Sequence, residues 1–229
     1  MSSITAGEKG YKGVAMEGPV ARRYAKLRRS GNQLEDWKNQ ALQLTRALPN
    51  GADILEVAPG PGYFAIEMAR IGRFHVTGLD ISRTFVQIEE ESARAAGVSA
   101  TFRLGDASNM PFADGSFDLV VCQAAFKNFR RPDRAIDEMH RVLREGGTAV
   151  IQDMRKDAPD GAIREEVRGM GLGPVGAFLT RRILSGLRRR AYSSEQLEQM
   201  ANRSPFGRGE IATSGIGVEL RLKKRGSAT

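Results

Sequence analysis

Short apolar stretches alternate with amphipathic ones along most of the chain, and this alternation predicts its strands and helices. Apolar runs bounded by glycine, proline or polar turns favour strands, whereas apolar positions that recur every three or four residues favour helices. Strands are expected at residues 53–58, 74–81, 100–104, 117–124, 148–154, 209–213 and 217–223. Helices are expected at residues 19–29, 32–48, 63–70, 84–96, 163–170, 174–187 and 194–203, and between Arg131-Pro132 and Gly146-Gly147.

The order of these elements predicts an α/β fold. Five strand–helix alternations followed by a terminal hairpin indicate a Rossmann-like, doubly wound and mostly parallel sheet of seven strands. The terminal strand is expected to be antiparallel, with helices at the N-terminus and a helical insert before the last two strands. Residues 1–16 are rich in glycine and lack periodicity, so we expect a flexible arm there.

The first predicted strand leads into residues 58–62, whose sequence APGPG is typical of a tight turn before a helix. Prolines stiffen such a turn, while glycines lack the Cβ atoms that would block a ligand approaching the backbone. The helix that follows presents unpaired N–H groups to that ligand. The pattern Gly60-x-Gly62-x-x-Ala65 also fits the dinucleotide-binding fingerprint, so the turn alone leaves a nicotinamide cofactor open.

Polar residues follow the next three predicted strands. Asp80 ends the second strand, Asp106 comes directly after the third, and Gln123 lies near the end of the fourth. Because the carboxyl ends of parallel strands meet at one edge of a sheet, we expect these residues and the glycine turn to converge on one crevice. The carboxylate of Asp80 has the two acceptor oxygens that a ribose diol needs.

Five stretches carry a family resemblance when they are taken together. They are ILEVAPGPG (54–62), GLDIS (78–82), GDA (105–107), MPFADGSFD (110–118) and MHRVLREGG (139–147). The chain thereby resembles the class I S-adenosylmethionine-dependent methyltransferases, and most closely the branch of ubiquinone/menaquinone-biosynthesis and other small-molecule methyltransferases. The resemblance covers residues 52–155 well and the terminal hairpin loosely, but scarcely the N-terminal helices or residues 156–205.

The resemblance implies a cofactor, S-adenosylmethionine or its product S-adenosylhomocysteine, and a role for each matching residue. Glu56 and the turn that contains Ala58, Gly60 and Gly62 are expected to hold the methionine portion. Independently of the resemblance, Tyr24 in the predicted helix 19–29 is expected to be a packing residue and is also a candidate for part of a cap over the cofactor.

The other half of the cofactor is expected to lie on the later strand ends. Asp80 is expected to accept hydrogen bonds from both ribose hydroxyls, and Ile81 to pack on the adenine. Asp106 is expected to meet the adenine amino group, and Ala107 to donate its backbone N–H to the ring. Gln123 is expected beside the methionine end.

The chain departs from the family pattern at two places. The first glycine of the usual turn is Ala58, which we expect to have a negative φ, since a side chain there argues against a left-handed conformation. Many relatives have a histidine just after the fourth strand, but neither His75 nor His140 is there. Lys127 and Asp153 are therefore the catalytic candidates; the alternatives are a solvated lysine and an Asp153–Arg155 ion pair.

Composition limits the class of protein further. A chain of 229 residues suffices for one domain, which we divide into an arm and cap helices (1–50), a cofactor-binding core (51–155), a helical lid or substrate insert (156–205) and a terminal β-hairpin (206–229). The single cysteine, Cys122, excludes a disulfide framework, and no metal site is predicted. No apolar stretch is long enough to span a bilayer, and the N-terminus lacks a signal-peptide pattern, so a cytoplasmic location is expected.

The net charge of +8 is unevenly distributed. Residues 51–160 contain thirteen bases and seventeen acids, whereas the two flanks are basic. Five arginines and no acid lie between residues 180 and 190. That segment is either a solvated lid helix or a surface for an acidic substrate, nucleic acid or an anionic membrane.

These observations favour methyl transfer from S-adenosylmethionine to a small organic acceptor, achieved mainly by proximity and in-line alignment. Two alternatives share some features. A nucleic-acid methyltransferase would explain the basic flanks, although the Asn/Asp-Pro-Pro-aromatic motif is missing after the fourth strand. A nicotinamide-dependent oxidoreductase would explain the glycine turn but not Asp106-Ala107. The acceptor, the methylated atom and the oligomeric state, monomer or homodimer, stay open.

Overall fold

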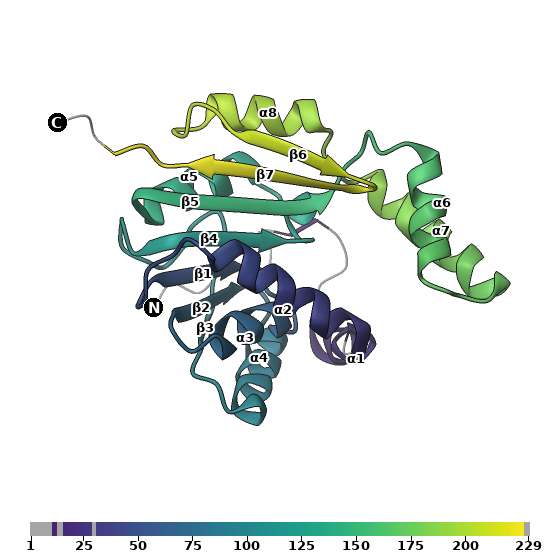
Figure 1. Cartoon of the computed structure of the whole chain (residues 1–229), viewed down its shortest axis with the longest axis horizontal. Coiled ribbons are helices and arrows are strands. Elements are labelled where there is room, and N and C mark those ends of the chain that lie inside the picture. Colours follow the sequence, from purple (N-terminus) through teal and green to yellow (C-terminus); the bar gives the residue numbers. More distant parts are fainter. Residues whose placement is uncertain (1–10, 13–15, 29–30, 227–229) are drawn as a thin grey trace.

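The computed structural model describes residues 11–12, 16–28 and 31–226, which form an α/β fold around a seven-stranded sheet (Figure 1). The strands are β1 (Asp53–Val57), β2 (His75–Asp80), β3 (Thr101–Leu104), β4 (Phe117–Gln123), β5 (Leu143–Met154), β6 (Glu210–Ser214) and β7 (Gly217–Lys223). Their order across the sheet is β3-β2-β1-β4-β5-β7-β6. β1 to β5 are parallel, and β7 is antiparallel to both of its neighbours. The predicted fold class and the antiparallel terminal strand are confirmed.

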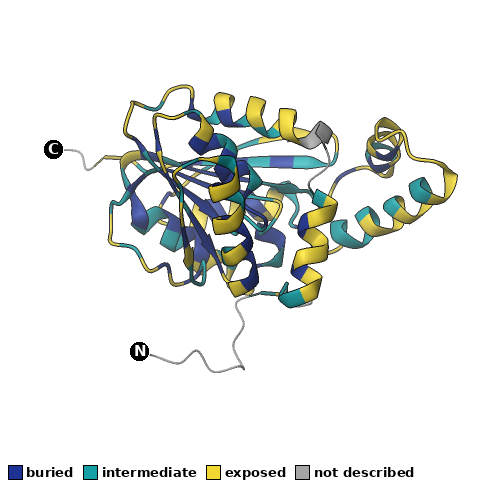
Figure 2. Ribbon diagram, turned by 90° about the horizontal axis from the view of Figure 1, so that it is seen from below, coloured by how far each residue is buried: buried dark blue, intermediate teal, exposed yellow. Residues whose placement is uncertain are grey.

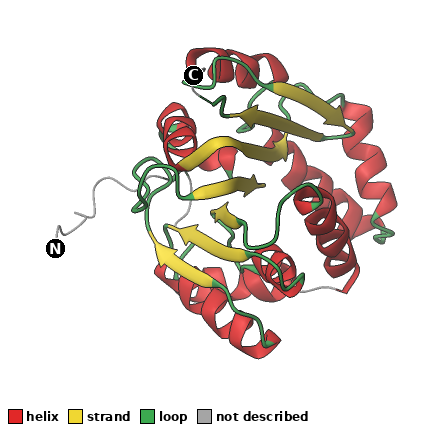
Figure 3. Cartoon of the chain, turned by 60° about the vertical axis from the view of Figure 1, so that its left-hand side comes forward, coloured by secondary structure: helices red, strands yellow, loops and turns green. Residues whose placement is uncertain are grey.

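Helices cover both faces of this sheet (Figure 3). They are α1 (Gly18–Arg28), α2 (Gly31–Thr45), α3 (Tyr63–Arg70), α4 (Arg83–Ala96), the 3-10 helix η1 (Phe126–Asn128), α5 (Pro132–Val142), α6 (Asp160–Gly169), α7 (Pro174–Arg188) and α8 (Ser194–Arg203). The three helices predicted before the terminal hairpin are confirmed as α6, α7 and α8. No helix of the described residues combines the length and the apolar character that a membrane crossing requires.

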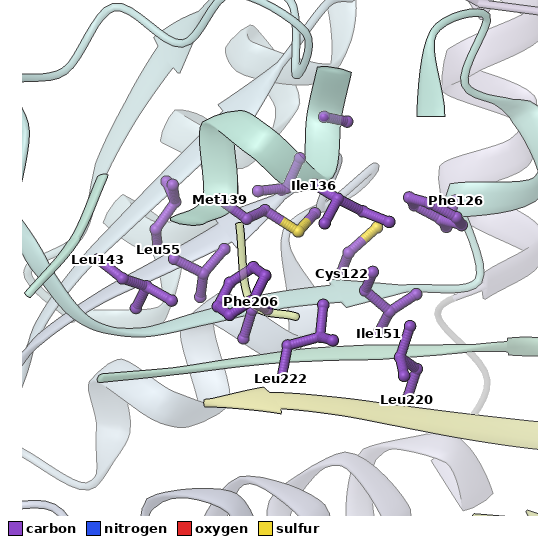
Figure 4. Packing of buried hydrophobic residues seen from close by; sticks show 14 of the residues in the cluster. Leu55, Cys122, Phe126, Ile136, Met139, Leu143, Ile151, Phe206, Leu220 and Leu222 are labelled. Carbon is purple, nitrogen blue, oxygen red and sulfur yellow. The ribbon is translucent and has the colours of Figure 1, made fainter. Parts of the chain in front are cut away.

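Burial on both faces explains why the central strands are continuous apolar runs. Leu55 and Val57 of β1 point into a cluster with α5 and α8, whereas Ile54 points into a second cluster with α2, α3 and α4. Figure 4 shows Leu55 in the first cluster beside Ile136 and Met139 of α5. Strands covered in this way need apolar residues at every position. The central strands are accordingly buried, whereas the edge strand β6 and the outer helices are largely exposed (Figure 2).

The strand order reverses between β1 and β4. β1 pairs with β2 on one side and β4 on the other, so the chain winds outward from β1 in both directions. Helices on the two sides diverge at such a point and leave a crevice beyond the carboxyl ends of the strands. The fold therefore places the segments after β1, β2, β3 and β4 together at this edge of the sheet, the region that we call the crevice.

The predicted boundary between α5 and β5 is wrong. The helix ends at Val142, and Leu143 already pairs with Phe117 of β4, so Gly146 and Gly147 lie within β5. Four residues of β5 bulge out before the regular register resumes at Leu119 opposite Thr148. The positive φ of Gly146 (76°) permits this bulge, so the glycines shape the strand rather than end the helix.

The expected flexible arm is also wrong where residues 1–16 are described. Tyr11 forms an isolated bridge with Phe129, and the backbone N–H of Lys12 donates to the carbonyl of Asn128 (2.6 Å). The carbonyl of Met16 accepts a hydrogen bond from Ser82 Oγ (2.6 Å). The N-terminal segment is thus attached to the loops after β2 and β4; residues 1–10 and 13–15 lie outside the described residues.

Candidate active site

The turn between β1 and α3 is built on left-handed backbone conformations. Gly60 (φ 60°) and Gly62 (φ 78°) have positive φ values, as expected of glycine. A Cβ on Gly62 would lie 2.9 Å from Cγ of Glu89, so only glycine fits there. A Cβ on Gly60 would meet no protein atom within 4 Å, which means that its backbone faces open space.

Ala58 contradicts the sequence-based expectation, because its φ is +57° rather than negative. A left-handed conformation costs an L-residue about 1–2 kcal/mol, which is unfavourable but not excluding. The hydrogen bond from Ala58 N to the carbonyl of Leu79 on β2 (2.8 Å) holds the residue in this conformation. Ala58 therefore has the backbone geometry that glycine has in the usual turn.

Asp80 connects the end of β2 to this turn. Its carboxylate is 4% exposed and accepts hydrogen bonds from the backbone N–H groups of Ser82 (2.8 Å) and Gly60 (3.2 Å). Burial raises the pKa of Asp80 to about 6, although these two hydrogen bonds oppose that shift. The neighbouring residue Ile81 is 37% exposed. Its side chain is therefore accessible to a ring such as adenine.

The N-terminal segment lies over the same loop. Glu17 accepts hydrogen bonds from the side-chain hydroxyl of Thr84 (2.6 Å) and from the N–H of Arg83 (3.0 Å). Ser82, whose hydroxyl caps α4 by accepting from Phe85 N (3.0 Å), also donates to the Met16 carbonyl. These contacts bring residues 16–17 to the site, which the sequence pattern did not indicate.

Two further carboxylates lie beneath the turn. Glu56 of β1 is 2% exposed and Glu89 of α4 is fully buried. Within the described part of the chain, nothing hydrogen-bonds to Oε2 of Glu56 or to either carboxylate oxygen of Glu89. Burial raises the pKa of Glu56 to about 8. Burial, together with repulsion from Asp80 and Glu56, raises the pKa of Glu89 well above its usual value.

Sequence reasoning missed Glu89, although a signal was present. Phe85, Ile88 and Ala93 define the buried face of α4, and Glu89 follows Phe85 by four residues on that face. An acid at a position that helical spacing assigns to the core is unusual, because burying an unpaired carboxylate is costly. A cationic ligand would favour the ionised forms of the buried acids Glu56, Asp80 and Glu89, because its charge would offset the cost of burying theirs.

This cluster predicts that the ligand-free protein loses stability as the pH rises from about 4.5 to about 8. Unfolded carboxyl groups release their protons near the lower value, whereas burial keeps Glu56 and Glu89 protonated in the folded chain. The folded state then binds more protons than the unfolded state in this pH window. The unfolding free energy is therefore greatest below the window and decreases as the pH rises across it, by up to about 1.4 kcal/mol per pH unit for each group.

Urea unfolding of Glu89→Met across this pH window tests the assignment. The substitution should flatten the pH dependence and raise the unfolding free energy at the upper end by about 1–3 kcal/mol, because an unpartnered buried carboxyl group is removed. Glu90→Met, at the exposed neighbouring position, is the matched control and should leave the slope unchanged. A Glu89→Met protein with the wild-type slope would show that Glu89 is hydrated.

The loop after β3 is held by its own hydrogen bonds. Asp106 Oδ1 accepts from the N–H (2.8 Å) and the hydroxyl (2.7 Å) of Ser108, and Oδ2 lies 3.4 Å from Arg131 Nη2. Ala107 is half-buried against the core cluster. Asp106 is therefore positioned at the predicted place with one oxygen only weakly paired; its contact with an adenine amino group stays a prediction.

Gln123 belongs to an amide relay at the ends of β4 and β5. Its Nε2 donates to Gln152 Oε1 (2.9 Å), which also accepts from Gln40 Nε2 of α2 (2.7 Å). Gln152 Nε2 in turn donates to Glu219 of β7 (2.7 Å). The relay connects the N-terminal helices with the last strands and orients the Gln123 side chain at the crevice.

Lys127 and Asp153 form a buried ion pair. Neither of the two alternatives, a solvated Lys127 and an Asp153–Arg155 pair, predicted this contact. Lys127 Nζ lies 2.7 Å from Asp153 Oδ1, and their side chains are 7% and 5% exposed. Asp153 also accepts from the backbone N–H groups of Lys127 (2.9 Å) and Met154 (2.7 Å). Arg155 contacts Asp157 (3.8 Å) instead of Asp153. The expected solvated lysine and the Asp153–Arg155 pair are wrong; a catalytic role for Lys127 and Asp153 stays a prediction.

The aromatic residues of the N-terminal helices pack beside the site. Tyr24 of α1 contacts Phe85 of α4 edge-on (6.0 Å between centroids) and remains 38% exposed. Trp37 of α2 packs on Tyr63 (5.4 Å), whose hydroxyl donates to the carbonyl of Ala25 (3.1 Å). Tyr24 is close enough to α4 for its predicted capping role, which stays a prediction.

The two histidines lie away from this crevice. His140 packs edge-on against Phe206 (4.8 Å), and His75 lies 3.3 Å from Asp53 at the start of β1. The described residues contain no group of His, Cys, Asp and Glu side chains suited to a metal ion.

Comparison with protein families agrees with this geometry. A family described as "Methyltransferase domain" matches residues 55–151, which run from β1 into β5 and contain the turn, Asp80, Asp106 and Gln123. Residues 55–151 are thus similar to a methyltransferase domain. The predicted family resemblance is thereby confirmed for the part of the chain that holds the crevice.

The chain is also similar to two methyltransferases. The protein is 37% identical over 99 residues to a demethylmenaquinone methyltransferase from Deinococcus radiodurans, covering 43% of this chain and 41% of the relative. It is 32% identical over 150 residues to a ubiquinone/menaquinone biosynthesis C-methyltransferase from Geotalea daltonii, covering 63% of each. The matched parts thus span less than two thirds of either relative.

The fold resembles a solved structure over nearly its whole length. A Methanococcus maripaludis protein assigned as an S-adenosyl-L-methionine-dependent methyltransferase superposes with a TM-score of 0.72 and 18% identity, covering 95% of this chain and 98% of that one. At this identity the likeness establishes the methyltransferase fold. The nucleic-acid and nicotinamide alternatives find no support in these matches.

Proposed function

We propose that the protein transfers a methyl group from S-adenosylmethionine to a small organic acceptor. The observation that carries this proposal is the convergence of the glycine turn, Asp80 and Asp106 at the switch point of the sheet. The match of the methyltransferase family to the same segment supports it.

The residues of the crevice fit the proposed cofactor. Gly60 offers bare backbone facing open space, and Glu56 has a buried oxygen without a partner in the described residues. Asp80, with its two oxygens at the end of β2, would hold the ribose diol. A cationic ammonium and sulfonium would stabilise the ionised forms of the buried acids. Ile81, Asp106 and Ala107 would contact the adenine, and Gln123 the methionine end.

S-adenosylmethionine, when bound, supplies an activated methyl group, so this chain's residues need mainly to orient the acceptor for in-line displacement. The amide relay of Gln40, Gln123 and Gln152 would fix the acceptor side of the crevice. The Lys127–Asp153 pair holds the loop after β4 against β5. If the acceptor must lose a proton, a group on the acceptor side of the crevice would remove it.

We further propose a quinone-type ring as the acceptor and its carbon as the methylated atom. The names of the relatives support this class, because they are demethylmenaquinone and ubiquinone/menaquinone methyltransferases. The cap helices (1–50) and the insert (156–205) differ from the family pattern and flank the crevice, so we propose that they build the acceptor pocket.

Mass spectrometry of the products tests the proposal. The protein is incubated with S-adenosylmethionine and a reduced demethylated naphthoquinone, and we expect S-adenosylhomocysteine together with an acceptor heavier by one methylene unit. Gly60→Val should abolish the reaction, because a side chain would occupy the ligand's space.

Gly115→Val is the matched control, since Gly115 also has a positive φ (63°) and open space but lies in a turn remote from the crevice. The Gly115→Val variant should retain its turnover as long as it folds. Absence of S-adenosylhomocysteine with this quinone and with a pooled metabolite extract would overturn the proposal. Product from the extract alone would overturn only the quinone class.

A further inference from the structure

Two helices outside the core expose apolar side chains between basic ones. On α1, Val20 and Leu27 are 49% and 69% exposed, and their spacing of seven residues places them on the same face. The helix also contains Arg22, Arg23 and Lys26 but no acid. A helix with this composition and exposed apolar face is typical of one that lies on a membrane surface.

Helix α7 repeats this pattern more strongly. It contains no buried residue, and Val175, Phe178, Leu179 and Ile183 are 54–74% exposed along one stripe. The guanidinium of Arg182 lies 5.9 Å from the centre of the Phe178 ring, so the positive charge stays beside the stripe. We call these six apolar side chains of α1 and α7, with the basic residues of both helices, the α1/α7 face.

Both helices project on the same side of the molecule. In Figure 1, α1 and the α6–α7 pair extend beyond the sheet on the side where β4 and β5 end. Figure 2 shows the α6–α7 pair standing away from the body of the protein, mainly in the colours of exposed and intermediate residues. The contact of Arg188 with Asp160 (2.7 Å) and with the carbonyl of Ala158 (2.8 Å) anchors the base of α7. The base of α7 is therefore held in place, and both helices lie on the side of the molecule where β4 and β5 end.

Charge decides which partner suits this face. Among the described residues no carboxylate lies within ion-pair distance of Arg22, Arg23, Arg181 or Arg182. Closing α1 onto α7, or pairing two copies of the chain through this face, would bring like charges together. Nucleic acid would satisfy the charges but not the aliphatic stripe, since bases stack on aromatic side chains.

We propose that the α1/α7 face docks on the surface of an anionic phospholipid membrane. The apolar stripes would enter the boundary between headgroups and acyl chains, and the arginines and lysine would contact the headgroups. The crevice edge would then lie near the bilayer. This docking is independent of methyl transfer, because it requires no bound cofactor and no turnover.

Co-sedimentation of the full chain with vesicles tests the proposal. Wild-type protein should bind vesicles of phosphatidylcholine with phosphatidylglycerol and should bind pure phosphatidylcholine vesicles at least about tenfold more weakly. Phe178→Ser/Ile183→Ser, and separately Leu27→Ser, should each weaken binding to the anionic vesicles, the double variant by about tenfold or more. Arg181→Gln/Arg182→Gln should weaken binding and reduce its salt dependence.

The matched control is Arg94→Gln/Arg208→Gln, which removes two exposed arginines outside this face. It should bind anionic vesicles within about twofold of wild type.

Thermal melting checks that each variant folds, as expected for substitutions at exposed positions. The proposal would be overturned if the wild-type protein did not bind anionic vesicles, or if the serine variants bound them as strongly as the wild type does. Serine variants that convert a wild-type dimer into a monomer in gel filtration would assign the face to self-association instead.

Discussion

Asp80→Ala is expected to weaken the binding of S-adenosylhomocysteine at least about tenfold in isothermal titration calorimetry. Hydrogen bonds to a charged acceptor contribute about 1.5–3 kcal/mol each, and the carboxylate would accept from two ribose hydroxyls. The raised pKa of about 6 adds a pH dependence. Affinity should be highest above that value, where the carboxylate is ionised, and should decline below it as the group gains a proton.

A second variant separates ligand binding from local structure. Asp80 also accepts hydrogen bonds from the backbone N–H groups of Ser82 and Gly60. The Asp80→Ala substitution therefore removes the acceptor of both groups. Asp80→Asn retains one acceptor oxygen for the loop and should keep the fold while still losing affinity. Asp36→Ala, at an exposed position of α2, is the control and should bind normally. An unchanged dissociation constant in both Asp80 variants would refute the assignment of the ribose site.

Lys127→Met is expected to lower the unfolding free energy by about 3–5 kcal/mol. Breaking a buried ion pair leaves one charge uncompensated in a region of low dielectric, and this costs far more than losing an exposed pair. Both side chains are less than a tenth exposed, so water cannot replace the missing partner. Urea unfolding at neutral pH measures the difference.

The double variant Lys127→Met/Asp153→Asn tests whether the loss comes from the unpaired charge. The asparagine oxygen can still accept from one of the two backbone N–H groups of Lys127 and Met154, and no unpaired charge remains. The double variant should therefore recover much of the stability lost in the single variant. A single variant of wild-type stability whose turnover is nevertheless lost would favour the catalytic assignment of this pair over a structural one.

The crevice could be predicted because its main components follow from local patterns and one rule of topology. Apolar runs identified the parallel strands, and the residues just after them, Asp80 and Asp106, had to meet at the carboxyl edge. The terminal hairpin and the helices α6 to α8 were predictable for the same reason, since each has its own periodicity and turn residues.

The remaining features depended on contacts between segments that are distant in the sequence. Ala58 adopts a positive φ because β2 supplies the acceptor for its N–H, and Leu143 begins a strand because Phe117 lies opposite. Lys127 became a buried cation only through Asp153, twenty-six residues away. Glu89 is a site residue because the turn of Gly62 packs against it.

The sequence by itself determined the order of strands and helices, the turn chemistry and the set of residues at one sheet edge, because these depend on residue spacing and on the right-handed winding of parallel strands. Only the tertiary structure decided how deeply the acids Glu56, Asp80 and Glu89 are buried, which partners the charges have and where the N-terminal segment lies. Burial and pairing set the free energy of a charge, and both arise from neighbours that spacing along the chain does not reveal.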